Sequence, residues 1–179
     1  MTTACGGGGG GVAPTPTGST PTPPPPTTAS SPYDETKKTA EDAFNADLAA
    51  KLTAAEAWLD TNAADAAVRT LESGLQYRVI KTGNSTGVTA SQFSVAKLHF
   101  DASTADGRIF NSSFQRGAPV ELKTADMIPG WQDAVAQMSP GDEWIVYLHP
   151  SLAYGETGYG ASVPPNSVTV YRIALIDRF

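Results

Sequence analysis

The fold is decided by four short stretches in the second half of the chain: GRIFNSS at 107–113, IPGW at 128–131, LAYG at 152–155 and VPPN at 163–166. Glycine or proline occurs in each stretch and marks a turn or a loop. The first three stretches also carry an aromatic side chain, namely Phe110, Trp131 and Tyr154. Taken singly, each ring is more simply explained as part of a hydrophobic core. The interpretation therefore depends on the order and spacing of the whole set.

The sequence around these stretches predicts an antiparallel sheet with one short helix. Residues 68–71 and 75–80 have the composition of two short strands, and the Glu72-Ser73-Gly74 turn predicts a hairpin between them. Further strands are expected at 94–103, 108–110, 143–149 and 168–176. In this half only 131–138 is expected to be helical, after Pro129-Gly130. This is an α+β fold in which an antiparallel β-sheet wraps around one short helix.

A longer helix is expected before this sheet, at about 34–61. This region contains no proline or glycine and is rich in Ala, Glu, Lys and Leu. Its apolar residues follow one another at three- and four-residue steps and form one stripe: Phe44, Leu48, Leu52, Ala55 and Leu59. A single helix cannot leave such a stripe in water, so it should pack either on the following domain or on a second copy of itself. The sequence does not decide between the two.

The first 32 residues differ from the rest in composition. Glycines at 6–11 are followed by Pro- and Thr-rich sequence to Pro32, and this part carries no charged side chain. So few apolar groups cannot offset the entropy of ordering the chain, which predicts a disordered tether. We therefore divide the chain into a tether at 1–32, an amphipathic helical segment at 33–65 and a folded domain at 66–179.

Cys5 predicts a lipid anchor. Thr3-Ala4-Cys5-Gly6 resembles the end of a bacterial lipoprotein signal, in which small residues precede a cysteine that becomes acylated. The alternative is an incidental exposed thiol. With acylation, the tether would hold the domain away from the membrane of a bacterial cell envelope, as a periplasmic or outer-membrane lipoprotein.

Composition excludes several other classes of function. The formal net charge is -6 and the sequence pI is about 4.8, without the basic cluster that a nucleic-acid partner requires. One cysteine allows no intramolecular disulfide and no cysteine-based zinc site. His99 and His149 have no matching nucleophile motif and are expected to be ordinary strand residues. We expect no metal and no cofactor.

The four stretches, in this order and at this spacing, resemble the landmarks of FKBP-type peptidyl-prolyl cis/trans isomerase domains. The run LESGLQY at 71–77 is similar to the bacterial branch that includes the macrophage infectivity potentiator proteins. Members of that branch are secreted or envelope-bound isomerases, often dimeric through a longer N-terminal helical segment. The resemblance implies proline-containing polypeptide clients, a possible tacrolimus-type macrolide ligand and a possible homodimer through the N-terminal helix.

The resemblance also implies which residues form the site. Trp131 would form the floor of an apolar pocket, and Tyr154 and the backbone amide of Ile128 would donate hydrogen bonds to the substrate. The implied catalytic residues are Tyr154, Trp131, Phe110 and Asn111. The implied substrate-binding residues are Phe100, Val120, Met127, Ile128, Val163 and Tyr171. Such a pocket needs no nucleophile, because the twisted amide is less polar than the planar one and a dry pocket stabilises it.

Four of these positions depart from the usual family pattern. The family usually has Tyr at Phe100, Asp at Asn111, an aromatic residue near Val120 and Phe at Tyr171. A neutral amide at Asn111 weakens any charge-assisted hydrogen bond across the pocket. We therefore expect an isomerase that is less efficient than the best family members. The alternatives are a non-catalytic chaperone or peptide-binding module that uses the same pocket, and a purely structural envelope lipoprotein.

Overall fold

The computed structural model describes residues 32–83 and 94–179, so the expected tether and Cys5 lie outside the described residues. The helices are α1 (Pro32–Ala63), α2 (Ser113–Arg116) and α3 (Pro129–Gln137). The strands are β1 (Arg69–Thr70), β2 (Gln76–Lys81), β3 (Val95–Thr104), β4 (Ile109–Ser112), β5 (Val120–Lys123), β6 (Glu143–Leu148) and β7 (Thr169–Arg178). Short 3-10 turns occur at Thr124–Asp126, Pro150–Leu152 and Gly155–Thr157.

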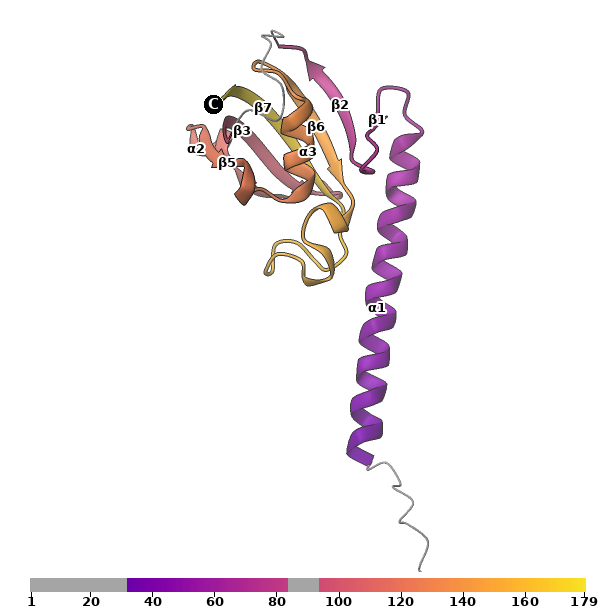
Figure 1. The fold of residues 1–179 in the computed structure, drawn as a ribbon. Coiled ribbons are helices and arrows are strands. Elements are labelled where there is room, and N and C mark those ends of the chain that lie inside the picture. The colour runs from indigo at the N-terminus through magenta and orange to yellow at the C-terminus, as the bar shows by residue number, and fades with distance from the viewer. Residues whose placement is uncertain (1–31, 84–93) are drawn as a thin grey trace, which may run out of the picture.

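Within the described residues the strands form one antiparallel sheet in the order β1-β2-β6-β7-β3-β4, and β5 pairs with β3. The predicted α+β fold is confirmed, including the 69–81 hairpin and the N-terminal helix (Figure 1). The prediction that only 131–138 is helical in this half is wrong, because α2 also forms. The Ser112 side chain caps α2 by accepting from the Gln115 amide, and Gly117 ends it with φ 71°.

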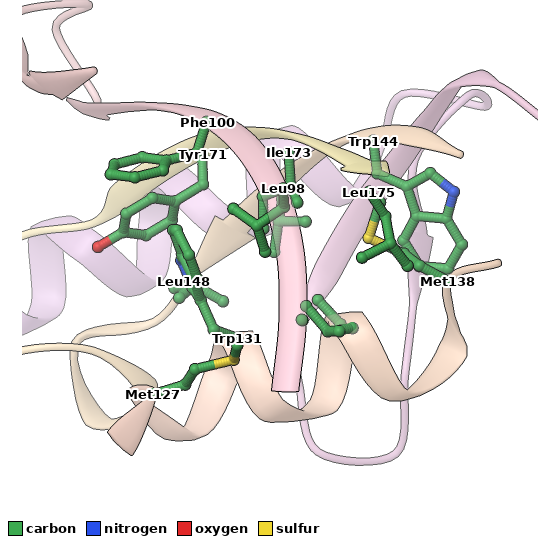
Figure 2. Packing of buried hydrophobic residues seen from close by; sticks show 14 of the residues in the cluster. Leu98, Phe100, Met127, Trp131, Met138, Trp144, Leu148, Tyr171, Ile173 and Leu175 are labelled. Carbon is green, nitrogen blue, oxygen red and sulfur yellow. The ribbon is translucent and has the colours of Figure 1, made fainter. Parts of the chain in front are cut away.

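Helix α3 covers one face of the sheet, and the main core lies between them (Figure 2). Burial alternates strictly along β3 and β6, which places every second side chain toward α3. Gly130, in the first turn of α3, lies so close to β6 that a Cβ there would be 2.4 Å from a methyl carbon of Leu148. The start of α3 is thereby fixed against the sheet.

Helix α1 docks on the opposite face of the sheet. Ala55 and Leu59 pack with Val168 in a second buried cluster, to which Trp58, Tyr147 and Val170 are added. Tyr147 lies between Val146 and Leu148, which point to the α3 side, so α1 is on the other side. Trp58 contacts Tyr147 with a centroid distance of 5.8 Å.

Only the C-terminal half of α1 is covered. Leu48 is buried, whereas Phe44 is 59 % exposed, and the N-terminal half of the helix extends away from the sheet (Figure 1). The expected stripe therefore docks in cis from Leu48 onward and leaves its first member in solvent. None of the helices in the described part of the chain has a stretch long and apolar enough to cross a bilayer.

Candidate functional site

A cavity of about 300 Å³ opens where the start of α3 meets the twisted strands β3, β4 and β7. Most of its lining is apolar or aromatic, with a few polar side chains. The lining residues are Phe100, Ala102, Phe110, Asn111, Arg116, Val120, Leu122, Asp126, Met127, Ile128, Trp131, Tyr154 and Tyr171. A concave apolar site with few polar groups is the usual form of a ligand pocket.

Trp131 lies at the base of this cavity with two aromatic rings standing against it. The indole is buried, and the rings of Phe100 and Tyr171 meet it at centroid distances of 5.0 and 5.3 Å with interplanar angles of 77° and 89°. Figure 2 shows these three side chains gathered at one end of the core, beside Met127. Edge-to-face contacts of this kind hold the rings in fixed orientations. The wall and the base of the cavity are therefore rigid.

The opposite side of the cavity comes from β4 and from the loop after β6. Phe110 meets Tyr154 at 6.3 Å and Tyr171 at 6.4 Å, in both cases nearly perpendicular. Tyr154 in turn stacks on the exposed ring of Tyr159, with centroids 5.0 Å apart. The loop closes tightly at Gly158, where a Cβ would be 2.3 Å from the carbonyl oxygen of Val163. This close approach fixes the loop that carries Tyr154.

Two hydrogen-bond donors at the cavity have no partner within the described part of the chain. The hydroxyl of Tyr154 makes no hydrogen bond there, and neither does the backbone N–H of Ile128, the N-cap residue of α3. The Ile128 carbonyl, by contrast, accepts from the amides of Trp131 and Gln132. Both residues line the cavity, so both donors are available to a bound carbonyl group.

Tyr171 brings a buried hydroxyl to the wall. Burial raises the pKa of Tyr171 above its usual value of 10.0, and the hydroxyls of Thr169 and Tyr154 nearby modify it further. None of these contacts has the geometry of a regular hydrogen bond, and the Tyr171 hydroxyl stays unpartnered within the described residues. The phenol is therefore neutral at physiological pH and contributes to the wall as an uncharged group.

The polar edge of the cavity is formed by Asn111 and Arg116. The Arg116 Nη1 atom donates to the Asn111 Oδ1 atom at 2.6 Å, and its guanidinium carbon lies 5.7 Å from the centroid of the Phe100 ring. Sequence reasoning missed Arg116, Asp126, Ala102 and Leu122 as lining residues. Arg116 follows the GRIFNSS stretch closely, but an exposed arginine in a turn carries no signal that places it beside a pocket.

Nine of the ten residues that the resemblance implied lie around this one cavity. The tenth, Val163, is 1 % exposed and does not line it. The backbone of Val163 forms a β-bridge with Tyr159, and this bridge closes the loop that follows Tyr154. The roles of the nine residues in binding and catalysis stay predictions.

Neither histidine lines the cavity. His99 Nδ1 lies 3.1 Å from the Ser113 hydroxyl, and the ring stacks on Phe114. Ser113 is fully buried, so it is not accessible as a nucleophile. His149 contacts Ser151 at 2.8 Å. Over the described ranges, the acidic, histidine and cysteine side chains form no cluster that could hold a metal ion.

Two family models match the chain. Residues 87–176 match the model described as FKBP-type peptidyl-prolyl cis-trans isomerase, and residues 20–79 match the domain amino terminal to FKBP-type peptidyl-prolyl isomerase. The first match contains all of the cavity residues, and the second contains α1, β1 and the first part of β2.

Individual relatives agree with these matches. The chain is 38 % identical over 120 residues to the FKBP-type 22 kDa peptidyl-prolyl cis-trans isomerase of Escherichia coli, covering 67 % of this chain and 57 % of that protein. It is 30 % identical over 141 residues to the outer membrane protein MIP of Legionella longbeachae, covering 79 % and 59 %. The chain thus spans a little over half the length of these curated relatives.

A solved structure shares the arrangement of elements. The crystal structure of FkpA from Escherichia coli superposes with a TM-score of 0.69 at 26 % identity, covering 82 % of this chain and 67 % of that chain. The shared region is longer than the 87–176 match alone, so the likeness extends beyond the sheet.

Proposed function

The chain belongs to the family of FKBP-type peptidyl-prolyl cis-trans isomerases, and on that premise we propose that its pocket accelerates rotation about X-Pro peptide bonds. The observation that carries the proposal is the cavity itself, with perpendicular rings around Trp131 and two free donors at its edge. The family gives the reaction, and this cavity supplies a mechanism for it in this chain.

The reaction requires the loss of amide resonance. Rotation about a peptide bond faces a barrier of ~18–20 kcal/mol because the planar amide is delocalised. The twisted amide has less charge separation than the planar one, so a dry apolar pocket stabilises it relative to water. Phe100, Trp131 and Tyr171 are all buried and supply such surroundings. No proton transfer to a side chain is needed.

The donors orient the substrate. With the proline ring on the Trp131 indole, the Tyr154 hydroxyl and the Ile128 N–H would each take one carbonyl oxygen of the client segment. Each neutral hydrogen bond of this kind contributes about 0.5–1.5 kcal/mol. Together the two hydrogen bonds hold the client segment on both sides of the X-Pro bond while this amide rotates.

The test is a protease-free measurement of cis–trans exchange in a proline tetrapeptide by NMR. We expect Tyr154→Phe to lower kcat/KM about two- to tenfold, as the loss of one hydrogen bond predicts, and Trp131→Leu to lower it further. Tyr77→Phe is the matched control, because Tyr77 stacks on Trp144 at the far end of the core. If the wild-type protein does not accelerate cis–trans exchange, the proposal is overturned.

A non-catalytic chaperone using another surface gives a different result in the same experiment. It would suppress the aggregation of an unfolded client equally well with Tyr154 or Phe at this position, and the wild-type protein would not accelerate exchange. Aggregation of a reduced, unfolded protein is therefore followed in parallel with the exchange assay.

The envelope location belongs to the same proposal. We propose that Cys5, outside the described residues, is acylated and anchors the chain in a bacterial envelope, where proline-containing exported proteins are its clients. The relative named as an outer membrane protein supports this setting. A mass spectrum of the N-terminal peptide from cells tests it, since acylation adds the mass of the lipid and Cys5→Ser removes it.

Two further partners are proposed for the pocket and the helix. A tacrolimus-type macrolide would occupy the Trp131 cavity and abolish catalysed exchange. A second copy of the chain would cover the exposed side of Phe44 on the uncovered half of α1. Sedimentation of the wild type and of Phe44→Ser tests the second proposal, because a dimer held by this surface dissociates when the ring is lost.

A further inference from the structure

The mouth of the pocket carries a cation that no carboxylate of the described residues neutralises. Arg116 is the cationic side chain among the cavity residues, and its one hydrogen bond within the described part of the chain goes to the neutral amide of Asn111. Among the ion pairs formed by the described residues, none includes Arg116. An arginine with a carboxylate partner would have its charge offset, but an amide oxygen offsets only one N–H.

The acidic residues nearby do not fill this role. Asp101 accepts from Ser112 and lies 4.0 Å from Arg172, and Glu143 accepts from the same arginine at 2.6 Å. Asp126 lines the cavity as well, but it forms no ion pair with Arg116. Asp101 and Glu143 are thus paired with Arg172, and Glu121 on β5 is paired with Lys97. Arg116 keeps its charge toward the cavity.

Arg116 is also held in place. It is the last residue of α2, whose single turn is closed by the Ser112 cap and by Gly117. The contact with the Phe100 ring and the bond to Asn111 restrict the guanidinium further. A restricted group loses less entropy when it binds a ligand than a free side chain does.

We propose that Arg116 determines specificity, so that the pocket prefers proline segments with Asp or Glu immediately before the proline. This inference rests on the proposed function. Trp131 and Arg116 both contact the Phe100 ring, whose centroid lies 5.0 Å from the Trp131 centroid and 5.7 Å from the Arg116 guanidinium carbon. The Cα of the residue before the proline lies about 3.8 Å from the proline Cα. A glutamate side chain at that position extends across the Phe100 ring toward Arg116. The unused guanidinium donors match a carboxylate.

The test compares peptides that differ only in the residue before proline, which is Glu, Gln or Lys. Binding is measured by NMR titration of the 179-residue chain, so that the result does not depend on turnover. We expect the Glu peptide to bind about threefold more tightly than the Gln peptide, as exposed ion pairs allow, and the Lys peptide to bind most weakly. The Glu preference decreases when the ionic strength rises.

Two variants and one control locate the effect. Arg116→Gln removes the charge, and Asn111→Asp supplies the missing carboxylate, so both should bring the Glu and Gln peptides to equal affinity. Arg78→Gln makes the same charge change on β2, where the arginine pairs with Asp65 away from the cavity, and should keep the preference.

Equal affinity for the Glu and Gln peptides in the wild type overturns the inference while leaving the isomerase proposal intact. A Glu preference that survives in Arg116→Gln also overturns it, because the selectivity would then come from another group. Failure to bind any of the three peptides, together with unchanged cis–trans exchange, sinks the proposed function itself.

Discussion

The two faces of the sheet hold their helices by different means. On one face α3 packs through a large apolar cluster that includes Trp131, Val135 and Leu148, and this packing forms the base of the pocket. On the other face α1 buries a small cluster around Ala55 and Leu59 and is held in addition by side-chain amides. Apolar burial is strong but non-directional, whereas amide hydrogen bonds fix a helix at defined positions along its length.

The side-chain amides that hold α1 come from β2 and from the loop before β7. Gln76 Nε2 donates to the carbonyl of Leu59 at 3.0 Å, and Asn166 Nδ2 donates to the carbonyl of Leu48 at 2.8 Å. The two carbonyls are about three helical turns apart and so lie on the same side of α1. The backbone amide of Asn166 also donates to the carbonyl of Gly155 at 2.8 Å. The docking of α1 is therefore joined to the loop that carries Tyr154.

The largest effect is expected on the α3 face. Leu148 is fully buried and fits against Gly130 at the start of α3, so Leu148→Ala should lower the free energy of unfolding by about 2–5 kcal/mol. Urea denaturation followed by tryptophan fluorescence measures it. A loss below 1 kcal/mol would mean that the α3 face is no more tightly packed than an exposed surface.

Leu59→Ala makes the same truncation on the α1 face, and we expect a loss near the low end of that range, about 2 kcal/mol, because this cluster is small and lies at the edge of the domain. The loss should appear as undocking of α1 rather than unfolding of the sheet. Hydrogen exchange tests this, since amides of α1 would lose protection while those of β3 and β7 keep it. Equal loss of protection in both would show that the two faces unfold as one unit.

These two faces also differ in how far they can be predicted from sequence. The ordered stretches around Phe110, Trp131 and Tyr154 predicted the cavity through their resemblance to a family, because each ring taken singly was more simply explained as part of the core. The stripe on α1 predicted which side of the helix is buried. It did not predict where burial stops, because nothing in the spacing distinguishes Phe44 from Leu48.

Contacts between distant residues were beyond sequence reasoning. The bond from Asn166 to Leu48 joins positions 118 residues apart, and no local pattern encodes it. Strand β5 was not predicted, since its alternating run is only four residues long and depends on pairing with β3. Arg116 was missed for the same reason, because its neighbours Phe100 and Asn111 are brought to it by the sheet.

Asn166→Ala breaks the link between α1 and the Tyr154 loop. Asn166 is buried and has φ 52°, so alanine loses the hydrogen bond to Leu48 and adds strain, for an expected cost of roughly 1–3 kcal/mol. Asn166→Gly is the matched control, because glycine accepts this φ and loses only the side-chain bond. Thermal unfolding of both variants separates the two contributions. Equal stability of the alanine variant and the wild type would show that α1 does not depend on this residue.

The smallest effect at neutral pH is expected from Tyr171→Phe, on the pocket wall. The Tyr171 hydroxyl is buried and has no hydrogen-bond partner among residues 32–83 and 94–179, so its removal at pH 7 should change the free energy of unfolding by less than about 1 kcal/mol. The difference should grow in alkali. Burial raises the pKa of Tyr171 in the folded state above its usual 10.0, so the unfolded chain releases this proton first. The wild type therefore keeps the stability that this hydroxyl contributes below pH 10 and loses it as the pH rises further. Tyr171→Phe lacks this contribution.

Urea denaturation of the wild type and of Tyr171→Phe at pH 7 and pH 10.8 measures this difference in stability. Parallel losses of stability in the two proteins would mean that the Tyr171 hydroxyl is open to water rather than buried in the pocket wall.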